Sequence, residues 1–468
     1  MFTFTDLFAG IGGFHAALSA TGGRCVFASE IDPWAATVYE DNWNLKVHGD
    51  IVPLTEDRMA VPTHDVLAAG FPCQPFSKSG YQRGMEETRG TLFFNICKVL
   101  EAHKPAVILL ENVRNLAGPR QRDTWSTIVR TLRELGYRVS DQPAVFSPHL
   151  LPKERGGRPQ VRERVFITGT YVGRDRALKE TDVKPVVTPA TKHDWERPDW
   201  DLERDLPLDD DKLIPDLHRY KLTEAETRWI DAWNDFLRSI DEEKIPGFPI
   251  WADEFRYPAD VAPGTPGWKA NLLRKNAALY DRNRGAIDNW RERWNDLEDF
   301  PSSRRKLEWQ AQGTTLADRD LWKTVMHFRP SGIRAKRPTY LPALVAITQT
   351  SIYGPRRRRI TPREASRLQG LPEWFDFGAQ GDAATYKQLG NGVNVGAAHY
   401  VFREHVLRDQ EDLRAIDDLG RGSGHIVDTV LASRLEPAVP ERECVTIGSV
   451  NRAVEVATPS IPTALLVD

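Results

Sequence analysis

The stretch Asp6-Leu7-Phe8-Ala9-Gly10-Ile11-Gly12-Gly13-Phe14 reads as the end of an apolar strand, a glycine-rich turn and the start of a helix. The same alternation continues to about residue 170. We expect strands at residues 3–8, 24–29, 65–70, 106–110 and 165–168, and helices near 13–20, 33–41, 91–102 and 123–135. Strands that alternate with helices predict an α/β fold, in which a parallel sheet carries helices on both faces. Ligands on such sheets bind beyond the carboxyl ends of the strands.

The composition is that of a soluble globular protein, with 468 residues, 40% apolar and 28% charged side chains. A net charge of −3 gives no overall basic field, so any DNA-binding surface has to be local. The cysteines form no CxxC pair, which argues against a disulfide framework and against a metal site. They are Cys25, Cys73, Cys97 and Cys444. No basic leader and no apolar run of about 18 residues occurs, so we expect a cytoplasmic protein without a membrane span.

Residues 171–355 differ from the first part in composition and hydrophobic pattern, and they predict a second domain inserted into it. Residues 201–216 are acidic and proline-punctuated, as in an exposed linker. Thr223 and Glu226 form a capping box before a helix with one apolar face, which we interpret as core and not as a binding surface. That face consists of Trp229, Ile230, Trp233, Phe236, Leu237 and Ile240. A second, basic helical stretch covers about residues 268–294.

Residues 356–408 return to the first domain. Thr361-Pro362-Arg363-Glu364 opens one helix, and Gly390-Asn391-Gly392-Val393-Asn394-Val395 precedes another that runs to about Arg408. Residues 409–468 form a C-terminal extension to which we assign no role, either as an ordered appendage or as a loose tail.

The glycine-rich turn predicts a nucleotide-like cofactor. Glycine lets the backbone approach a ligand, and Glu30 ends the second strand about 20 residues after Gly10, where it can accept hydrogen bonds from ribose hydroxyls. NAD would also fit these features alone. The spacing G-x-G-G and the acids Asp6, Glu30 and Asp50 at strand ends favour the cationic sulfonium of S-adenosylmethionine over a diphosphate. Asp50 either accepts from the adenine amino group or caps the turn that follows it.

A thiol and a carboxyl group are expected at neighbouring strand ends. Gly70-Phe71-Pro72-Cys73-Gln74-Pro75-Phe76-Ser77 presents Cys73 on a loop stiffened by prolines, and Glu111-Asn112-Val113 follows 38 residues after that cysteine, on a short polar loop. A thiolate that adds to C6 of cytosine makes C5 nucleophilic toward a methyl sulfonium, and an acid of raised pKa at N3 eases the addition. Alone, Cys73 fits an inert thiol and Glu111 a surface acid; their joint position favours catalysis.

Gln160-Val161-Arg162-Glu163-Arg164 alternates before a strand, which places Arg162 and Arg164 on one face. These arginines would lower the thiol pKa, orient Glu111 and bind the target phosphate. A solvated strand edge is the equal alternative.

Together these blocks resemble a DNA (cytosine-5) methyltransferase of the bacterial restriction–modification type, over about residues 3–170 and 355–405 and in that family's order. The resemblance implies a Rossmann-like sheet with an inserted target-recognition domain. It makes Cys73 the nucleophile and puts Glu111, Arg162 and Arg164 in the cytosine pocket. It implies that S-adenosylmethionine, which becomes S-adenosylhomocysteine, is bound by Phe8, Ala9, Gly10, Ile11, Gly12, Gly13, Glu30, Ile31, Asp50, Ile51, Pro72, Leu92, Asn391 and Val393.

The resemblance also implies a DNA surface. Met85-Glu86-Glu87-Thr88-Arg89-Gly90-Thr91-Leu92-Phe93-Phe94 resembles the hinge of a loop that closes on DNA, so that Ser77 and Arg89 touch the backbone or the flipped base. The inserted domain would end near residues 334–340, and Arg334, Lys336 and Arg337 would contact DNA. We expect a basic cleft, to which Arg155, Arg158, Arg162, Arg164 and residues 356–359 also contribute. Residues 356–359 also fit plain solvated surface.

The predicted function is methylation of C5 of a flipped-out cytosine in a specific duplex sequence, through a covalent Cys73–C6 adduct. It would protect host DNA from a restriction endonuclease, which the enzyme, a monomer at the nucleoid, need not contact. One alternative is a tRNA cytosine-5 methyltransferase, against which the long inserted domain argues. The other is a non-catalytic DNA-binding homologue, against which intact Cys73 and Glu111 argue.

Overall fold

The computed structural model describes residues 1–56, 58–72, 91–187, 200–206, 208–311, 318–344, 350–416 and 423–433. Its first sheet has the strand order β2-β1-β3-β4-β8-β5, and β6 also pairs with β8. The strands are β1 Phe2–Leu7, β2 Gly23–Ser29, β3 Val66–Gly70, β4 Val107–Val113, β5 Tyr137–Val139, β6 Ala144–Phe146 and β8 Arg164–Tyr171. The α/β prediction is confirmed.

The sheet is parallel from β2 to β4 and antiparallel at β8, so the expected parallel sheet is in fact mixed. No α-helix lies between β6 and β8, and antiparallel pairing needs no crossover helix. β4 also continues past its predicted end at residue 110, because Glu111 and Asn112 pair with Phe166 and Val165 of β8. The expectation that Glu111 lies on a loop is therefore wrong: it lies in the strand.

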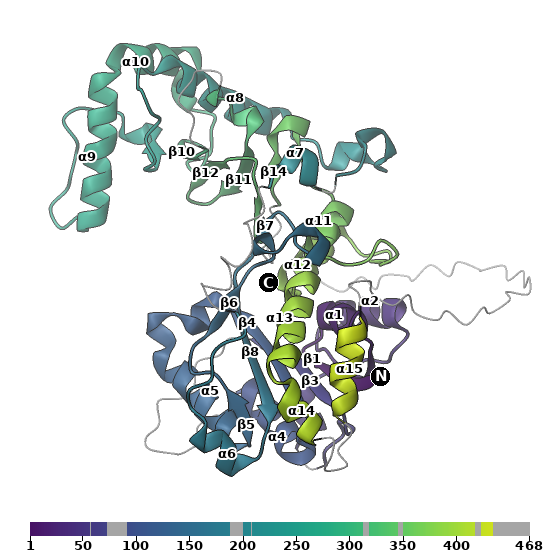
Figure 1. Cartoon of the computed structure of the whole chain (residues 1–468). Coiled ribbons are helices and arrows are strands. Elements are labelled where there is room, and N and C mark those ends of the chain that lie inside the picture. Colours follow the sequence, from purple (N-terminus) through teal and green to yellow (C-terminus); the bar gives the residue numbers. More distant parts are fainter. Residues whose placement is uncertain are drawn as a thin grey trace, which may run out of the picture. The chain divides into compact units, whose positions relative to one another are not determined.

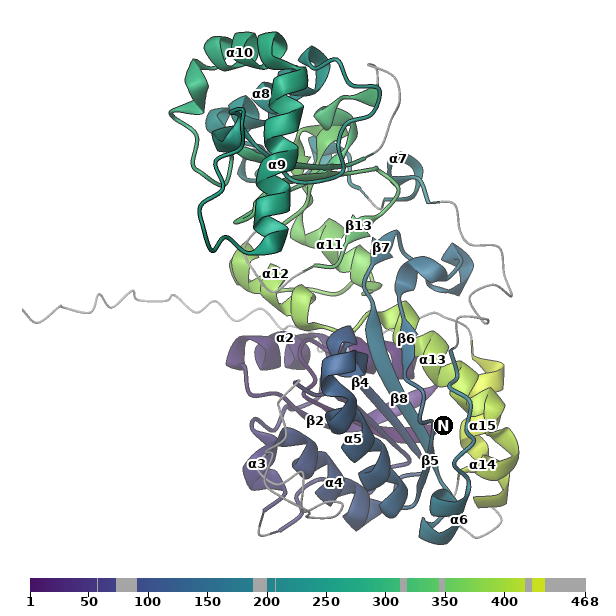
Figure 2. The same ribbon diagram turned by 90° about the vertical axis from the view of Figure 1, so that its left-hand side faces the viewer.

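Helices cover both faces of this sheet (Figures 1 and 2). Along β3, Val66 and Ala68 face one core, and Leu67 and Ala69 face the other, as strand alternation requires. The first core is covered by α1 Gly13–Ser19, α2 Pro33–Trp43 and α13 Val395–Arg408. The second is covered by α3 Ile51–Leu54, α4 Leu92–His103 and α5 Arg122–Glu134.

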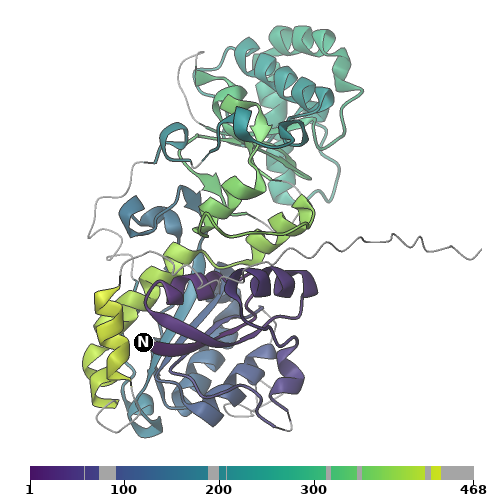
Figure 3. The ribbon, with the colours of Figure 1, turned by 90° about the vertical axis from the view of Figure 1, so that its right-hand side faces the viewer.

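The C-terminal part of the described chain packs on the first core. After α11 Pro362–Gln369 and α12 Asp382–Asn391, α13 leads into α14 Gln410–Ile416 and α15 Gly424–Ala432. Ile426, Val427 and Val430 of α15 are fully buried in the core that contains Phe2 of β1. In Figure 3 this yellow helix lies beside the purple N-terminal strand. The described part of the extension is therefore an ordered addition to the first fold.

The region between the two halves of the first fold contains a second sheet, with the order β15-β14-β11-β12-β10-β9. Its strands are β9 Ile250–Trp251, β10 Lys306–Gln310, β11 Val325–Arg329, β12 Gly332–Lys336, β14 Ile352–Tyr353 and β15 Arg358–Arg359. Its helices are α8 Glu224–Ser239, α9 Gly267–Arg282 and α10 Arg284–Arg293, preceded by α6 Arg174–Lys179 and α7 Leu202–Asp205. The pair β7 Gln160–Val161 and β13 Leu341–Pro342 forms a separate ribbon.

The predicted capping box of α8 is present, and its apolar face is core as expected. Ile230, Trp233, Phe236 and Leu237 are fully buried in a cluster of their own with the second sheet. Because Met1–Ala438 nevertheless form one compact unit, the domain boundaries at residues 171 and 355 stay a prediction. In the part of the chain that the structure describes, no helix has the length and apolar character to cross a membrane.

Candidate active site

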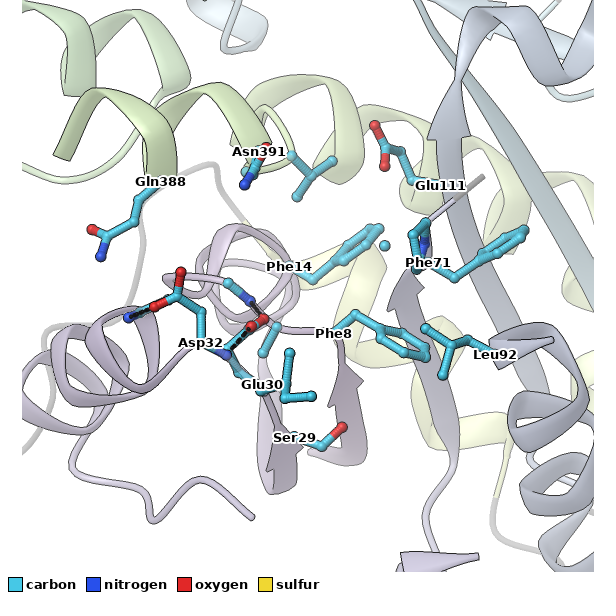
Figure 4. Close-up of a pocket in the computed structure, with 18 of the residues that line it drawn as sticks. Phe8, Phe14, Ser29, Glu30, Asp32, Phe71, Leu92, Glu111, Gln388 and Asn391 are labelled. Carbon is cyan, nitrogen blue, oxygen red and sulfur yellow. Dashed lines mark hydrogen bonds between the residues drawn. The ribbon is translucent and has the colours of Figure 1, made fainter. Parts of the chain in front are cut away.

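A cavity of about 510 Å³ lies at the carboxyl ends of β1 to β4, where the α/β pattern predicts a ligand. The glycine-rich turn, the residues that follow β2 and β3, the end of β4, Arg164 and the segment around α12 line it (Figure 4). The expected cofactor residues in this lining are Phe8, Ala9, Gly10, Glu30, Ile31, Asp50, Ile51, Pro72, Leu92, Asn391 and Val393.

The glycines of the turn divide into two kinds. Gly10 has a φ of +54°, and a Cβ there would meet no atom within 4 Å, so this position faces open space. A Cβ at Gly12 would lie 2.1 Å from Nε1 of Trp43, and one at Gly13 would lie 2.6 Å from the carbonyl oxygen of Val393. Ile11, Gly12 and Gly13 do not line the cavity. Gly12 and Gly13 are needed for close packing around the loop.

Two of the expected cofactor residues in the lining are carboxylates, Glu30 and Asp50. Glu30 accepts hydrogen bonds from the backbone N–H of Gly10 and of Asp32, both at 2.8 Å, and so ties the turn to the end of β2. Asp50 accepts from the N–H of Val52 at 3.0 Å as the N-cap of α3, so its capping role is present together with its place in the lining. Asp6 is fully buried and outside the lining, and burial raises its pKa. The expectation that Asp6 faces a ligand is wrong.

Glu111 and Arg164 form the reactive corner of the cavity. Nε of Arg164 lies 3.0 Å from Oε1 of Glu111, and both residues line the cavity. Burial raises the pKa of Glu111, although Arg164 and Arg162 pull it down. Such a carboxyl group holds its proton to higher pH than an exposed glutamate does, while a fixed guanidinium orients it.

Arg162 lies apart from that corner. The chain leaves β7 after Val161 and enters β8 at Arg164, so the expected single alternating strand is interrupted. The guanidinium of Arg162, only 1% exposed, donates to the carbonyl oxygens of Leu344, Gly390 and Gly392 at 3.1, 2.9 and 2.6 Å. Burial lowers its pKa to about 9, with Arg164 adding to the effect. Arg162 therefore joins its own segment to two distant stretches of backbone, at Leu344 and at residues 390–392.

The sequence model of the C-5 cytosine-specific DNA methylases matches residues 2–406. The chain belongs to this family. It is a DNA cytosine-5 methyltransferase, as its motifs predict.

The methylase is 48% identical to the type II methyltransferase M.AluI of Cellulosimicrobium cellulans, over 94% of this chain and 97% of that protein. It is 31% identical to the type II methyltransferase M.HpaII of Haemophilus parainfluenzae, over 85% of this chain and 87% of that protein. Among solved structures, the Dnmt2 methyltransferase of S. pombe aligns with a TM-score of 0.44 and 17% identity, over 87% of this chain and 99% of that one.

Several lining residues of the methylase were not expected from its sequence. Lys387 of α12 lies 3.2 Å from Asp32 at the start of α2, and both line the cavity. Asn112 donates its amide to the carbonyl oxygen of Phe71 at 2.8 Å, and so fixes the backbone that leads to Pro72. Asn112 directly follows Glu111 in the sequence. A second polar residue at the end of a strand could have identified it as a residue of the site. The others include Phe14, Ser29, Gln388 and Gly390.

The predicted nucleophile Cys73, and Ser77 and Arg89 with it, lie outside the described residues of the methylase. Arg334, Lys336 and Arg337 lie on or just after β12 and not in the cavity. Among residues 356–359, Arg358 is 1% exposed and paired with Glu364 at 2.8 Å, and Arg359 is paired with Glu226 at 2.6 Å. The expected phosphate contact is wrong for the buried Arg358, because its guanidinium is already paired with Glu364 and Asp211.

Arg158, also expected in the basic cleft, donates from Nε to the carbonyl oxygen of Arg367 at 2.9 Å. Burial lowers its pKa. Its guanidinium also donates to the carbonyl oxygen of Gly157. Arg158 therefore joins its own loop to the backbone of α11.

Proposed function

We propose that this methyltransferase transfers the methyl group of S-adenosylmethionine to C5 of a cytosine in duplex DNA, through a transient bond between Cys73 and C6. The observation that carries the proposal is that one cavity contains both the Gly10–Glu30 turn and the Glu111–Arg164 pair. A methyl donor in the first part would face a base in the second. Proximity of this kind converts a bimolecular transfer into an effectively unimolecular one.

The cavity residues fit the donor. Gly10 leaves open space where a side chain would intrude, Glu30 and Asp50 offer carboxylate oxygens to hydroxyl and amino groups, and these anions favour a cation over a diphosphate. S-adenosylmethionine would supply a methyl group on a positively charged sulfur. We assign its binding to the expected residues that line the cavity, and to Ile11, Gly12 and Gly13 only through the shape of the loop.

The roles in catalysis follow from chemistry. The Cys73 thiolate adds to C6, and Glu111 donates its proton to N3, so that the electron pair of the new enamine is available at C5. C5 takes the methyl group, the proton on C5 then leaves to solvent, and elimination restores the thiolate and the aromatic ring while N3 returns its proton to Glu111. Arg164 orients Glu111. Arg162 is a positioning residue, since its N–H groups are directed to carbonyl oxygens.

The target base has to leave the duplex to reach such a pocket. We assign DNA contacts to Ser77, Arg89, Arg334, Lys336 and Arg337. The likeness to type II methyltransferases supports a role in protecting host DNA from a restriction endonuclease. We propose further that the methyltransferase acts at the nucleoid as a monomer, without contact with that endonuclease.

The experiment is tritiated methyl transfer to duplex DNA and, in parallel, to tRNA, followed by bisulfite sequencing of plasmid from expressing cells. We expect incorporation into duplex DNA at one short sequence and none into tRNA. Cys73→Ser should abolish transfer, and the wild type should form a stable adduct with DNA containing 5-fluorocytosine. Transfer that persists in Cys73→Ser would refute the covalent mechanism, and preference for tRNA would refute the substrate.

A further inference from the structure

The glycine-rich turn is fastened by a tryptophan that does not line the cavity. Trp43, the last residue of α2, is buried, and its indole Nε1 donates a hydrogen bond to the carbonyl oxygen of Ile11 at 3.1 Å. Ile11 lies between Gly10, which faces open space, and Gly12, where an added Cβ would collide with the same Nε1. The indole therefore fixes the backbone of the turn from outside the cavity.

The first half of the turn is held in a different way. The backbone N–H of Gly10 donates to Glu30 at 2.8 Å, and that of Ala9 donates to the carbonyl oxygen of Ser29 at 2.9 Å. Both bonds lead to the end of β2, whereas the bond from Trp43 leads to α2. The indole thus anchors the second half of the turn to a helix.

One face of the indole is covered by a second ring. His15 of α1 stacks on Trp43, with ring centroids 4.2 Å apart and planes 16° from parallel. Nδ1 of His15 lies 2.7 Å from the hydroxyl oxygen of Tyr39, which is fully buried. Burial lowers the pKa of His15 to about 3, so the ring is neutral at physiological pH and packs as an uncharged aromatic. Tyr39 fixes His15, and His15 in turn fixes the indole.

The returning part of the chain also contacts the indole. Trp374 meets it edge to face, with centroids 5.2 Å apart and planes at 81°, and Phe375 packs against it at 6.0 Å. Asn42, next to Trp43, exchanges two hydrogen bonds with the backbone of Asp376, at 2.6 and 2.7 Å. Trp43 is therefore held by α1, by α2 and by residues 374–376, and its N–H has little freedom to turn away from the glycine-rich turn.

Resting on the proposed function, we propose that Trp43 is a positioning residue for the methyl donor. It acts through the carbonyl group of Ile11 and keeps the turn at Gly10 in the geometry that binds S-adenosylmethionine. A binding loop that is ordered before its ligand arrives loses less conformational entropy on binding, and the affinity is higher for that reason. Because Trp43 touches neither the donor nor the base, its removal should change the affinity for the donor and not that for DNA.

The test is calorimetric titration of the full chain with S-adenosylhomocysteine, with duplex binding measured in parallel by fluorescence anisotropy. Trp43→Phe keeps an aromatic ring and removes the N–H, so it should weaken binding roughly three- to tenfold, the range expected for one hydrogen bond. The KM for S-adenosylmethionine should rise by the same factor. The KM for DNA and kcat should each stay within about twofold of wild type, because the donor binds less tightly but reacts in the same place.

Tyr39→Phe tests the same chain of contacts one step away. It removes the hydroxyl group that fixes His15 and should weaken binding of S-adenosylhomocysteine by about two- to threefold, at the lower end of the hydrogen-bond range. Since Tyr39 acts through Trp43, the double variant Trp43→Phe/Tyr39→Phe should bind no more weakly than Trp43→Phe alone. Losses that multiply in the double variant would contradict this route.

Trp233→Phe is the matched control. Its indole also donates to a backbone carbonyl oxygen, that of Arg304 at 2.7 Å, but it is fully buried in the helical cluster of the second sheet. The variant should lose stability in urea much as Trp43→Phe does and keep its affinity for S-adenosylhomocysteine. An equal loss of affinity in Trp233→Phe, or unchanged affinity in Trp43→Phe, would overturn the proposal.

Two further outcomes are distinguishable. If Trp43→Phe does not fold, Tyr39→Phe decides, and unchanged affinity in that variant overturns the role of Trp43. An enzyme that binds S-adenosylhomocysteine with the expected differences between variants, yet methylates no cytosine in DNA, would sink the proposed function and leave the role of Trp43 standing.

Discussion

Glu111 is under two opposing influences. Its burial raises its pKa, while Arg164 at 3.0 Å and the more distant Arg162 stabilise the ionised form. The net effect is upward, so the carboxyl group keeps its proton at a pH where an exposed glutamate has lost it. A proton donor and an orienting cation are therefore held in one corner of the cavity.

Removing this proton should slow the reaction and leave the fold intact. We expect Glu111→Gln to lower the rate of methyl transfer by roughly 10²- to 10⁴-fold, the usual range for loss of a general acid, with DNA binding retained. Glu163→Gln, which removes a carboxylate paired with Arg114 at the surface, should stay within about twofold, as surface pairs contribute little. Single-turnover kinetics at saturating DNA measure both. Equal losses in the two variants would contradict the role of Glu111.

The glycines of the turn allow a second comparison. Gly12→Ala places a methyl group against the indole of Trp43 at a φ of +91° and should lower the free energy of unfolding by about 1–3 kcal/mol. Gly10→Ala meets no atom of the protein, so apart from about 1 kcal/mol of backbone strain at a φ of +54° its main effect should be weaker binding of S-adenosylhomocysteine, by tenfold or more if the methyl group displaces one polar contact. Denaturation and calorimetric titration separate the two. The idea fails if Gly12→Ala costs no stability or Gly10→Ala binds normally.

At the scale of elements, the sequence predicted the first sheet closely and the second hardly at all. The strands and helices of the first 170 residues came from clear changes of hydrophobic period. β10, β11 and β12 carry the same signal, for example Lys306-Leu307-Glu308-Trp309-Gln310, but they are short and were not assigned. Tryptophan and arginine occur in both helices and strands, so composition gave no further help.

The site shows the same limit. Glu30 lines the cavity because it follows β2, a strand that the sequence predicts. Asp50 caps α3 and Asn391 ends α12, two helices that were not predicted, so the cofactor role of Asn391 came from the family resemblance alone. Arg162 and Arg358 were misjudged for a common reason. Arg162 donates to a carbonyl at Gly390, and Arg358 pairs both with Asp211 and with Glu364, six residues on, and the local pattern does not show that these pairings bury the arginines.

Helix α15 offers a test at this scale, because it lies beyond the residues that the family model matches. Ile426 is fully buried, so Ile426→Ala should lower the free energy of unfolding by about 2–4 kcal/mol through lost contacts and a cavity. Leu431 on the same helix is 47% exposed, and Leu431→Ala should change it by less than about 0.5 kcal/mol. Urea denaturation measures both. If Ile426→Ala is as mild as Leu431→Ala, α15 does not stabilise the fold.

For the whole molecule, buried histidines control the response to acid. Burial lowers the pKa of His15 and His405 to about 3 and that of His64 and His399 to about 4, against 6.5 for an exposed ring. Above pH 6.5 the rings are neutral in both folded and unfolded chains, and their contribution to stability is complete. As the pH falls toward the folded pKa values, only the unfolded chain gains protons, and stability is lost.

The free energy of unfolding should therefore fall steeply below pH 6.5, with each ring contributing up to about 1.4 kcal/mol per pH unit. His399→Gln should reduce that slope by up to about 1.4 kcal/mol per pH unit, because the unfolded chain of the variant takes up one proton fewer. Urea denaturation at a series of pH values from neutrality to about pH 4.5 gives both slopes. A variant slope equal to that of the wild type would show that His399 does not titrate on unfolding.

The close approach of Gly13 and Val393 determines when, during synthesis of the chain, the cavity can form. One wall of the cavity comes from the turn after β1, and the facing wall comes from Lys387, Asn391 and Val393 near the other end of the chain. Since a polypeptide emerges from the ribosome N-terminus first, the early sheet can form while this wall is still unmade. A nascent chain that stops before Lys387 has half a binding site, so methylation has to wait until α12 and Val393 have been translated.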